Sequence, residues 1–316
     1  MSDVADKISQ LIKTSASKLG FAACGISRAQ HLDEESGYFR KWLKDGFHGS
    51  MAYMNRNVDK RLNPALLNEW ARSVIVVLYN YYPTDQQLSV ANFKISKYAY
   101  GKDYHDVIRE KLGKIVDTVE DEIGEIMARV FVDSAPIMER AWAQRSGLGW
   151  TGKNACLINK DMGSFFFIGT IITNLDLSYD TGESRNLCGK CTRCMDACPN
   201  GAIISPGVID ARKCISYLTI EHKGSFDNEA NVKLHDWIFG CDTCQDVCPW
   251  NRFSKPHDEP DFIPAEKLMA MGNEDWENLE EETFNELFKG TAVERTGYDN
   301  LRRNIERRKS QQGRED

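Results

Sequence analysis

Two cysteine motifs constrain this chain more than any other feature of its sequence. The first has the spacing C-x2-C-x2-C-x3-C-P and consists of Cys188, Cys191, Cys194, Cys198 and Pro199. The second repeats the last three cysteines and the proline, as Cys241, Cys244, Cys248 and Pro249. This spacing is typical of paired [4Fe–4S] clusters, in which the fourth cysteine of each run binds the other cluster. The second motif lacks its first cysteine, because Ile238 stands at that position.

Crossed ligation assigns the cysteines to two clusters. Cluster 1 takes four ligands, which are Cys188, Cys191, Cys194 and Cys248. Cluster 2 takes Cys198, Cys241 and Cys244, and Cys214 is the one unassigned cysteine of this region, so we expect it to be the fourth ligand. Two alternatives are a three-iron cluster with Cys214 merely buried, and zinc, since paired C-x2-C is also a zinc signature. The closed count of two times four and the two C-x3-C-P runs favour two [4Fe–4S] clusters.

The rest of the cysteine usage fits a reducing environment. The N-terminal segment has the apolar spacing of an amphipathic helix rather than of a signal peptide, and no apolar run approaches the roughly 20 residues that a membrane-spanning helix needs. We therefore expect a cytoplasmic protein without a membrane anchor, in which clustered cysteines hold metal. Cys24 and Cys156 lie in apolar runs that predict strands, so we expect both to be core residues.

The negative charge of the chain is local. The formal net charge is −7, but residues 258–289 alone contribute −9, which leaves about +2 for the remainder. A basic surface for a polyanionic partner is therefore compatible with the composition.

The order of the expected elements predicts an α+β fold. Residues 1–175 read as a mixed domain of helices and buried strands that do not alternate regularly. Residues 176–255 are rich in Cys, Gly and Pro, as expected of a metal-organised module, and residues 256–316 read as a helical extension. Neither G-x-G-x-x-G nor a P-loop occurs, so a Rossmann or nucleotide-phosphate site is not supported.

Asp133 is the candidate general acid of the first domain. It ends the apolar strand RVFV amid apolar neighbours, which disfavour the charged form of a carboxyl group. The alternative is an N-cap for a helix starting near Ile137, and the two interpretations have equal weight. Further on, Gly147, Gly149 and Gly152 permit close approach of a bulky ligand or, equally, a tight turn before a strand.

Several long segments resemble the epoxyqueuosine reductase family, cobalamin-dependent iron–sulfur enzymes of tRNA modification related to reductive dehalogenases. The matching segments are HGSMAYMNRNVDKRLNP, YAYGKDYH, VDSAPIMERAWAQRSGLGWTGKNACLI, GSFFFIG, both cysteine motifs, CISYLTIEHKG and TGYDNLRRNI. The resemblance implies a cobalamin domain similar to flavin nitroreductase folds, followed by a ferredoxin-like module with two [4Fe–4S] clusters. It also implies reduction of epoxyqueuosine to queuosine in the tRNA anticodon loop, the last step of queuosine biosynthesis. The alternatives are a dehalogenase-like reductase of small molecules and a ferredoxin-type electron carrier.

The resemblance also implies roles for individual residues. Asp133 would be the proton donor, and the cobalamin contacts would be Arg56, Tyr98, Asp133, Lys153, Asn154, Leu157, Ile168 and Ser216. A basic rim for tRNA would include His222, Lys223, Arg302 and Arg303, although a charged helix at a chain end is commonly just solvated. Some family members continue into helical repeats that help to hold tRNA, and this chain ends soon after TGYDNLRRNI, so we expect a tRNA footprint that is smaller or differently supplied. We further expect an external one-electron donor of flavodoxin or ferredoxin type, and a monomer.

Overall fold

Four antiparallel strands form the main sheet of the structure, which is a computed structural model that describes residues 2–84, 91–181, 185–226 and 233–312. The strands are β1 (Ala23–Arg28), β2 (Ser73–Asn80), β7 (Phe166–Thr173) and β4 (Ala128–Phe131), in the spatial order β1-β2-β7-β4. The two central strands are almost wholly buried apolar runs. Because each pair is antiparallel, the sheet fits the expected α+β class and not a doubly wound fold.

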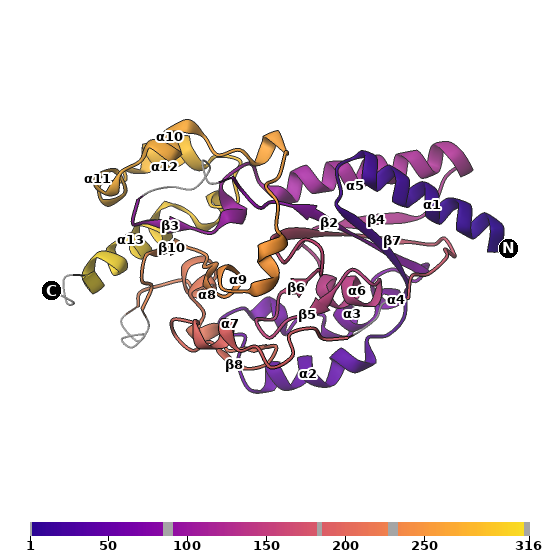
Figure 1. Ribbon diagram of the computed structural model, residues 1–316, viewed down its shortest axis with the longest axis horizontal. Helices are drawn as coiled ribbons and strands as arrows, with labels where there is room; N and C mark the ends of the chain where they lie inside the picture. The colour runs from indigo at the N-terminus through magenta and orange to yellow at the C-terminus, as the bar shows by residue number, and fades with distance from the viewer. Residues whose placement is uncertain (1, 85–90, 182–184, 227–232, 313–316) are drawn as a thin grey trace.

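Helices cover both faces of this sheet (Figure 1). On one face lie α1 (Ser2–Lys18) and α5 (Tyr104–Ile123), whose apolar stripes share a core with alternate residues of β2 and β7. On the other face lie α2 (Asp33–Lys44), α3 (Val58–Leu62), α4 (Pro64–Leu67) and α6 (Glu139–Arg145). Gly169 lets α5 approach β7 closely, because a Cβ there would meet Ile108 and Val77 at about 3.0 Å. The sheet is therefore the middle of three layers.

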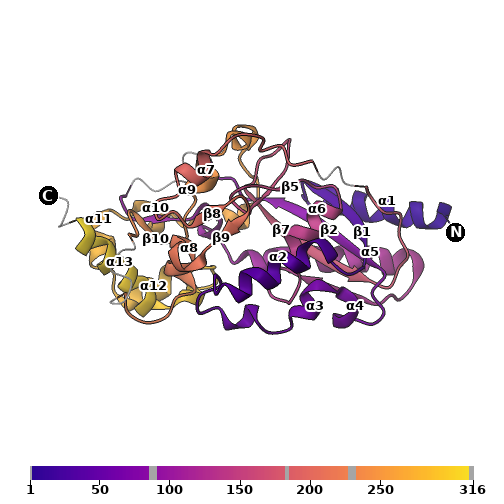
Figure 2. The same cartoon turned by 90° about the horizontal axis from the view of Figure 1, so that it is seen from below.

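The cysteine module is built from short elements. They are α7 (Arg193–Asp196), β8 (Ile203–Ser205), β9 (Val208–Ile209), α8 (Ile215–Ile220), β10 (Trp237–Phe239) and α9 (Thr243–Asp246). The hairpin β5–β6 (Trp150–Thr151 and Leu157–Ile158) of the first domain lies beside them in Figure 1, and Figure 2 shows β5 on the same side of the molecule as α7 and α9. Elements this short bury little apolar surface of their own, which agrees with a region organised around bound groups.

The C-terminal helices form a second core. They are α10 (Glu266–Ala270), α11 (Asn273–Glu277), α12 (Glu281–Phe288) and α13 (Tyr298–Gln312). They pack on the parallel pair of β10 with β3 (Lys94–Ile95), which brings residues of the first domain into this core. The termini lie at opposite ends of the molecule (Figure 1). The expected boundary between residues 1–175 and the rest of the chain is thus crossed by one continuous apolar cluster.

Helix α13 is not the solvated basic helix that its sequence suggests. Leu301 and Ile305 are fully buried, and so is Asn304, whose amide group donates 2.9 Å hydrogen bonds to the carbonyls of Thr219 and Ile238. The many charged residues of this helix made its apolar stripe, which packs against β10, hard to recognise in the sequence. Among the described residues, no helix is long and apolar enough to span a bilayer.

Candidate active site and cluster ligands

The four cysteines predicted for Cluster 1 lie together on two neighbouring helical turns. Cys188 and Cys191 lie in the turn before α7, Cys194 lies in α7, and Cys248 follows α9, which packs against α7. Burial, and after it the sulfurs of Cys188 and Cys248, raise the pKa of the Cys194 thiol to about 11. Burial raises the pKa of the Cys248 thiol, and the sulfurs of Cys188 and Cys191 contribute to the shift. The structure therefore groups the first three cysteines of one motif with the last cysteine of the other.

The cysteines predicted for Cluster 2 form a separate group. Burial raises the pKa of Cys214, and Cys198 is the sulfur that raises it further. The Cys214 sulfur likewise contributes to raising the pKa of Cys241 and of Cys244. The cysteine displaced from the second motif thus lies beside the two cysteines that it is predicted to join, as the N-cap residue of α8.

The two groups fit a bound cluster each. All ten cysteines are free thiols, so none forms a disulfide bond. In the described part of the chain, no three His, Cys, Asp or Glu side chains lie close enough to hold one metal ion. A cubane of four irons is larger than a single ion, so its thiolates are spread more widely than zinc ligands at about 2.3 Å from one atom. The division of the cysteines into two groups of four agrees with the predicted [4Fe–4S] ligation, which stays a prediction.

Neighbouring groups donate hydrogen bonds to several of these sulfurs. The indole Nε1 of Trp150 lies 3.4 Å from the Sγ atom of Cys188, and the backbone N of Ala202 lies 3.2 Å from the Sγ atom of Cys198. Donors aimed at ligand sulfurs stabilise the more negative, reduced state of a cluster. These contacts would therefore raise the reduction potential of a cluster held by either cysteine group.

Cys156 differs from the prediction that it is a plain core residue in a strand. It lies in a bend before β6, and its side chain is hydrogen-bonded to that of Cys244. Cys24, by contrast, lies in β1 as expected, where burial raises the pKa of its thiol to about 12. The strand predicted around Cys156 is only two residues long, Leu157–Ile158, because residues 152–156 turn to meet the cysteine module.

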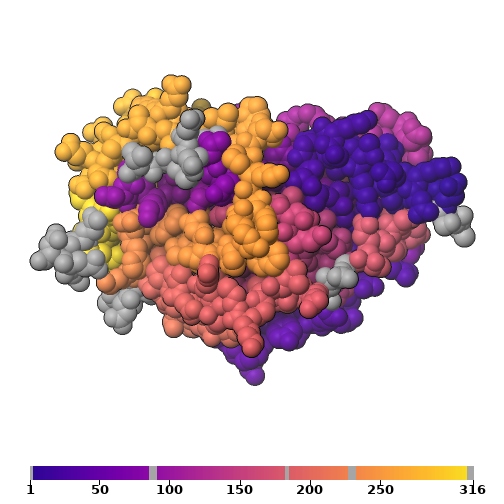
Figure 3. All heavy atoms as spheres, viewed as in Figure 1, coloured from indigo at the N-terminus to yellow at the C-terminus, as the bar shows by residue number. Residues whose placement is uncertain are grey.

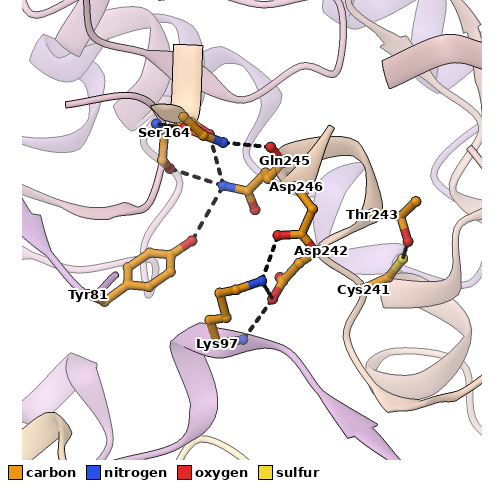
Figure 4. Close-up of polar contacts among 9 residues, drawn as sticks. Tyr81, Lys97, Ser164, Cys241, Asp242, Thr243, Gln245 and Asp246 are labelled. Atoms are coloured by element: carbon orange, nitrogen blue, oxygen red, sulfur yellow. Dashed lines mark hydrogen bonds and ion pairs between the residues drawn. The ribbon is translucent and has the colours of Figure 1, made fainter. Parts of the chain in front are cut away.

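Polar side chains tie the second motif to the first domain (Figure 4). Lys97 forms ion pairs with Asp246 at 2.6 Å and with Asp242 at 3.6 Å, and its backbone N donates to Asp242 at 2.8 Å. Asp242 is buried, and burial raises the pKa of its carboxyl group although Lys97 opposes the shift. Gln245 donates to the carbonyl and hydroxyl oxygens of Ser164 at 3.0 and 3.1 Å. These contacts fix α9, and hence Cys241 and Cys244, against the sheet.

Asp133 lies at the end of β4 in a conformation that few residues adopt. Its φ is +48°, in the left-handed region, which costs on the order of 1–3 kcal/mol for a residue other than glycine. Its carboxylate is exposed and accepts a 3.0 Å hydrogen bond from the Tyr104 hydroxyl. Helix α6 begins at Glu139 with Met138 as N-cap and no side-chain cap, so the N-cap interpretation of Asp133 is wrong.

The groups around Asp133 come from distant parts of the chain. The Tyr104 ring stacks on Phe167 at 4.1 Å, and burial raises the pKa of its hydroxyl, which Asp133 raises further. Burial and Asp133 also raise the pKa of Glu139 to about 8, and its Oε1 atom is buried without a partner among the described residues. The Nε atom of Arg61 is likewise buried without a hydrogen-bond partner among the described residues, and burial lowers the pKa of the Arg61 guanidinium. Sequence reasoning missed Tyr104 and Glu139 as site residues, although both lie in segments that carry the family resemblance.

Of the predicted cobalamin contacts, the structure brings Tyr98 to Asp133, and it places the others on several separate elements. Tyr98 lies with Asp133 and Tyr104, since Asp133 helps to raise the pKa of its buried hydroxyl and the two tyrosine rings are 5.9 Å apart. Leu157 is buried in β6, and Ile168 is half-buried in β7. Arg56 is exposed before α3, and Ser216 is half-buried on α8.

Two further predicted cobalamin contacts lie against the cysteine loops. Lys153 donates from Nζ to the Gly189 carbonyl at 2.9 Å, and Asn154 donates from Nδ2 to the Cys244 carbonyl at 3.4 Å. Gly149 serves the turn and not a ligand, because a Cβ there would meet the carbonyl oxygen of Ile158 at 2.1 Å. The tight-turn alternative therefore explains this glycine.

The predicted tRNA rim lies on α13 and on the loop after α8. Arg303 donates to three carbonyls of residues 218–224 at 2.7 to 3.1 Å, so its guanidinium holds that loop in place. Arg302 donates to the carbonyl of Glu277 at 2.7 Å. His222 and Lys223 lie in the loop itself, where Lys223 is exposed and its Nζ atom lies 3.3 Å from the Ile220 carbonyl oxygen. His222 and the two arginines are half-buried, so Lys223 is the most accessible of the four predicted residues.

Most of the chain is similar in sequence to known proteins. Residues 61–134 match the family described as epoxyqueuosine reductase QueG, DUF1730, and residues 187–251 match the 4Fe-4S double cluster binding domain. The epoxyqueuosine reductase of Cellulophaga algicola is 51% identical over 301 residues, which cover 95% of this chain and 98% of that protein. This chain belongs to the epoxyqueuosine reductase family. It is therefore an enzyme, and the electron-carrier alternative is wrong.

Solved structures agree with this assignment. An epoxyqueuosine reductase in complex with an epoxyqueuosine-modified stem loop of a tyrosine tRNA has a TM-score of 0.87 to this chain at 28% identity, covering 96% of this chain and 80% of that one. A reductive dehalogenase whose structure suggests a mechanism for B12-dependent dehalogenation has a TM-score of 0.50 at 16% identity, covering 96% of this chain and 38% of that one. The second likeness concerns the fold alone.

Proposed function

We propose that this protein reduces epoxyqueuosine to queuosine in the anticodon loop of tRNA. The observation that carries the proposal is the similarity to epoxyqueuosine reductases over almost the whole length of both chains. A solved member of the family holds an epoxyqueuosine-modified tRNA stem loop, which supports tRNA as the substrate class. The net reaction removes the epoxide oxygen as water and consumes two electrons and two protons.

The cofactors are two [4Fe–4S] clusters and cobalamin. The two cysteine groups supply four thiols to each cluster, and the double-cluster domain covers both motifs. For cobalamin, the fit rests on the first domain: an exposed Asp133, and the buried Glu139 Oε1 and Arg61 Nε atoms, whose hydrogen-bonding capacity the described residues leave unused. A corrin carries many peripheral amide groups that can meet such atoms.

The division of labour along the chain is also a proposal. Residues 1–175 would hold cobalamin on a nitroreductase-like domain, residues 176–255 the clusters, and residues 256–316 a helical extension. The antiparallel sheet with helices on both faces supports the first assignment. The monomeric state, the cytoplasmic location and a flavodoxin or ferredoxin donor stay predictions.

The chain's own residues control the proton in this reaction. When bound, cobalamin and the clusters supply the electrons that break the epoxide C–O bonds. Asp133 is proposed to give a proton to the leaving oxygen, because an alkoxide is otherwise a poor leaving group. Tyr104 holds the Asp133 carboxylate by its 3.0 Å hydrogen bond, and Phe167 fixes the Tyr104 ring by stacking. Glu139, with a pKa of about 8, keeps a second protonated carboxyl group near Asp133 at neutral pH.

The test is Asp133→Asn in cluster- and cobalamin-loaded protein. We expect the variant to keep its iron, its corrin absorbance and its affinity for an epoxyqueuosine stem loop, and to lose at least 100-fold in turnover, as general acids contribute 10²–10⁴-fold. Nucleoside mass spectrometry of the RNA measures queuosine formed. Asp106→Asn is the control, since Asp106 is an exposed partner of Arg109 on α5. Parent-level turnover in Asp133→Asn would refute the role, and conversion of halogenated organics but not of the stem loop would refute the function.

A further inference from the structure

A hollow of about 770 Å³ opens between the two cysteine helices α7 and α9. Its lining includes Cys248, a predicted ligand of Cluster 1, with the apolar Ala197, Val247 and Pro249 beside it. Figure 3 views the molecule from the side on which the segments around residues 190 and 250 reach the surface. The hollow therefore brings solvent, or a partner, directly to one of the two cluster sites.

The two cysteine groups differ in their access from this hollow. Cys248 of the first group lines it, whereas Cys198, Cys214, Cys241 and Cys244 of the second group do not. Electron transfer rates fall steeply with distance, so a redox partner seated in the hollow would pass its electrons to the first group.

The rim of the hollow carries unneutralised positive charge. Arg193 and Arg252 line it, both are exposed, and neither forms an ion pair with a residue that the structure describes. Two carboxylates also line it: Asp246 is paired with Lys97 at 2.6 Å, whereas Asp196 is exposed and keeps its charge, because its 2.7 Å hydrogen bond comes from an uncharged threonine hydroxyl. Two unpaired arginines against one unpaired carboxylate leave a small excess of positive charge on this rim, which favours an acidic partner.

Aromatic rings run from this rim to the first cysteine group. The Arg252 guanidinium lies 4.1 Å from the ring of Phe253, which is 38% exposed, and 5.7 Å from the ring of Trp250. Trp250 is 5.0 Å from Trp150, which donates its indole N–H to Cys188. A second pair of rings, Tyr82 and Phe165, lines the hollow itself. A flat apolar edge, such as the exposed edge of a flavin, packs well on such rings.

We propose that this hollow is the docking site of an acidic flavodoxin, whose exposed flavin edge enters it and reduces Cluster 1. The proposal rests on the proposed function in one respect, the two clusters. In each transfer the flavin hydroquinone gives up one electron and one proton, becoming a semiquinone; the electron reduces the cluster by one unit and the proton passes to solvent. Two transfers supply the two electrons of one turnover.

The experiment mixes reduced flavodoxin with the oxidised, cluster-loaded protein in a stopped-flow instrument and follows the cluster absorbance without tRNA. We expect the second-order rate to fall with rising salt, and to fall at least tenfold in the double variant Arg193→Glu with Arg252→Glu. Reduction by dithionite should be unchanged in that variant. Arg28→Glu with Arg72→Glu is the matched control, since these two exposed arginines lie at one end of the main sheet.

Parent-like reduction of the double variant by flavodoxin would overturn the proposal. So would salt- and charge-sensitive reduction by an acidic [2Fe–2S] ferredoxin with no such sensitivity for flavodoxin. If the charge-reversed protein loses iron, the milder pair Arg193→Gln with Arg252→Gln must still slow the reaction at least threefold. Because cluster absorbance is read without RNA, failure here and failure of the tRNA reaction are distinguished.

Discussion

Asp133 combines an exposed carboxylate with a left-handed backbone. Strain of this kind persists only where the surrounding structure enforces it, and it concentrates at functional sites. The strand end and the apolar neighbours were visible in the sequence, so the candidate acid was predictable. Its partner Tyr104 was not, because the contact joins residues 29 positions apart through the packing of α5 on β7.

Glu139 should make stability depend on pH. Its pKa is about 8 in the folded protein and about 4.5 in the unfolded chain, so the folded state binds more protons between these values and stability falls as pH rises. We expect Glu139→Gln, in protein without cobalamin, to unfold as the parent does at pH 4.5 and to gain about 2–4 kcal/mol over it at pH 8. Urea titrations across this range measure the difference. The exposed Glu125→Gln should follow the parent at every pH, and a Glu139→Gln curve parallel to the parent curve would contradict the assignment.

Trp150 should set the potential of Cluster 1. Its indole N–H points at the Cys188 sulfur, and Trp150→Phe removes that donor while keeping most of the buried ring. Losing a hydrogen bond worth about 0.5–1.5 kcal/mol lowers a one-electron potential by about 20–60 mV. Redox titration followed by EPR measures it, with Cluster 2 as an internal reference. Trp276→Phe is the matched control, since the Trp276 indole nitrogen is buried without a hydrogen-bond partner among the described residues. An unchanged Cluster 1 potential in Trp150→Phe would exclude this role.

At the scale of elements, the sequence predicts buried strands and amphipathic helices from local patterns, but it does not predict which distant strands pair. The apolar run of residues 73–79 lies in β2, and the apolar residues at helical spacing within 104–123 lie on the buried side of α5, because apolar periodicity reports burial directly. The parallel pair of β3 with β10 joins segments some 140 residues apart, and two-residue strands leave no pattern. Cys214 is an intermediate case: its position on α8 was unpredictable, but counting thiols pointed to its neighbours.

Asn304 should hold α13 to the cysteine module. Its amide pairs with the carbonyls of Thr219 on α8 and Ile238 on β10, and Asn304→Ala leaves two buried acceptors unpaired. We expect a loss of about 2–4 kcal/mol in the free energy of unfolding, measured by urea titration of cluster-loaded protein. Asn300→Ala, which removes one part-buried bond to Thr296, should cost about 0.5–1.5 kcal/mol. Equal costs for the two variants would show that α13 is not anchored here.

At the scale of the whole molecule, the negative charge of the chain is concentrated in one region. Most acidic residues of 258–289 lie on or beside α10, α11 and α12, whose apolar side chains pack on β3 and β10, whereas Glu259 is buried against Tyr79 and Lys111. The negative net charge therefore does not argue against a polyanionic substrate. Figure 1 places α13 and α8 on the same side of the molecule, which brings the loop after α8 to the edge of the predicted tRNA rim.

Lys223 should make one phosphate contact with the anticodon stem loop. It lies in the loop that Arg303 fixes by three carbonyl hydrogen bonds, and burial together with Arg303 and Arg295 lowers the pKa of its ammonium group. Each phosphate contact to single-stranded RNA adds about 0.7 to the slope of log K against log salt. We expect Lys223→Ala to weaken binding about threefold to tenfold near 0.1 M salt and to flatten that slope by about 0.7, in fluorescence anisotropy with a labelled stem loop. Arg303→Lys keeps the charge but loses the carbonyl contacts, so it should weaken binding with the slope unchanged. A full slope in Lys223→Ala, or a flattened one in Arg303→Lys, would reverse the two roles.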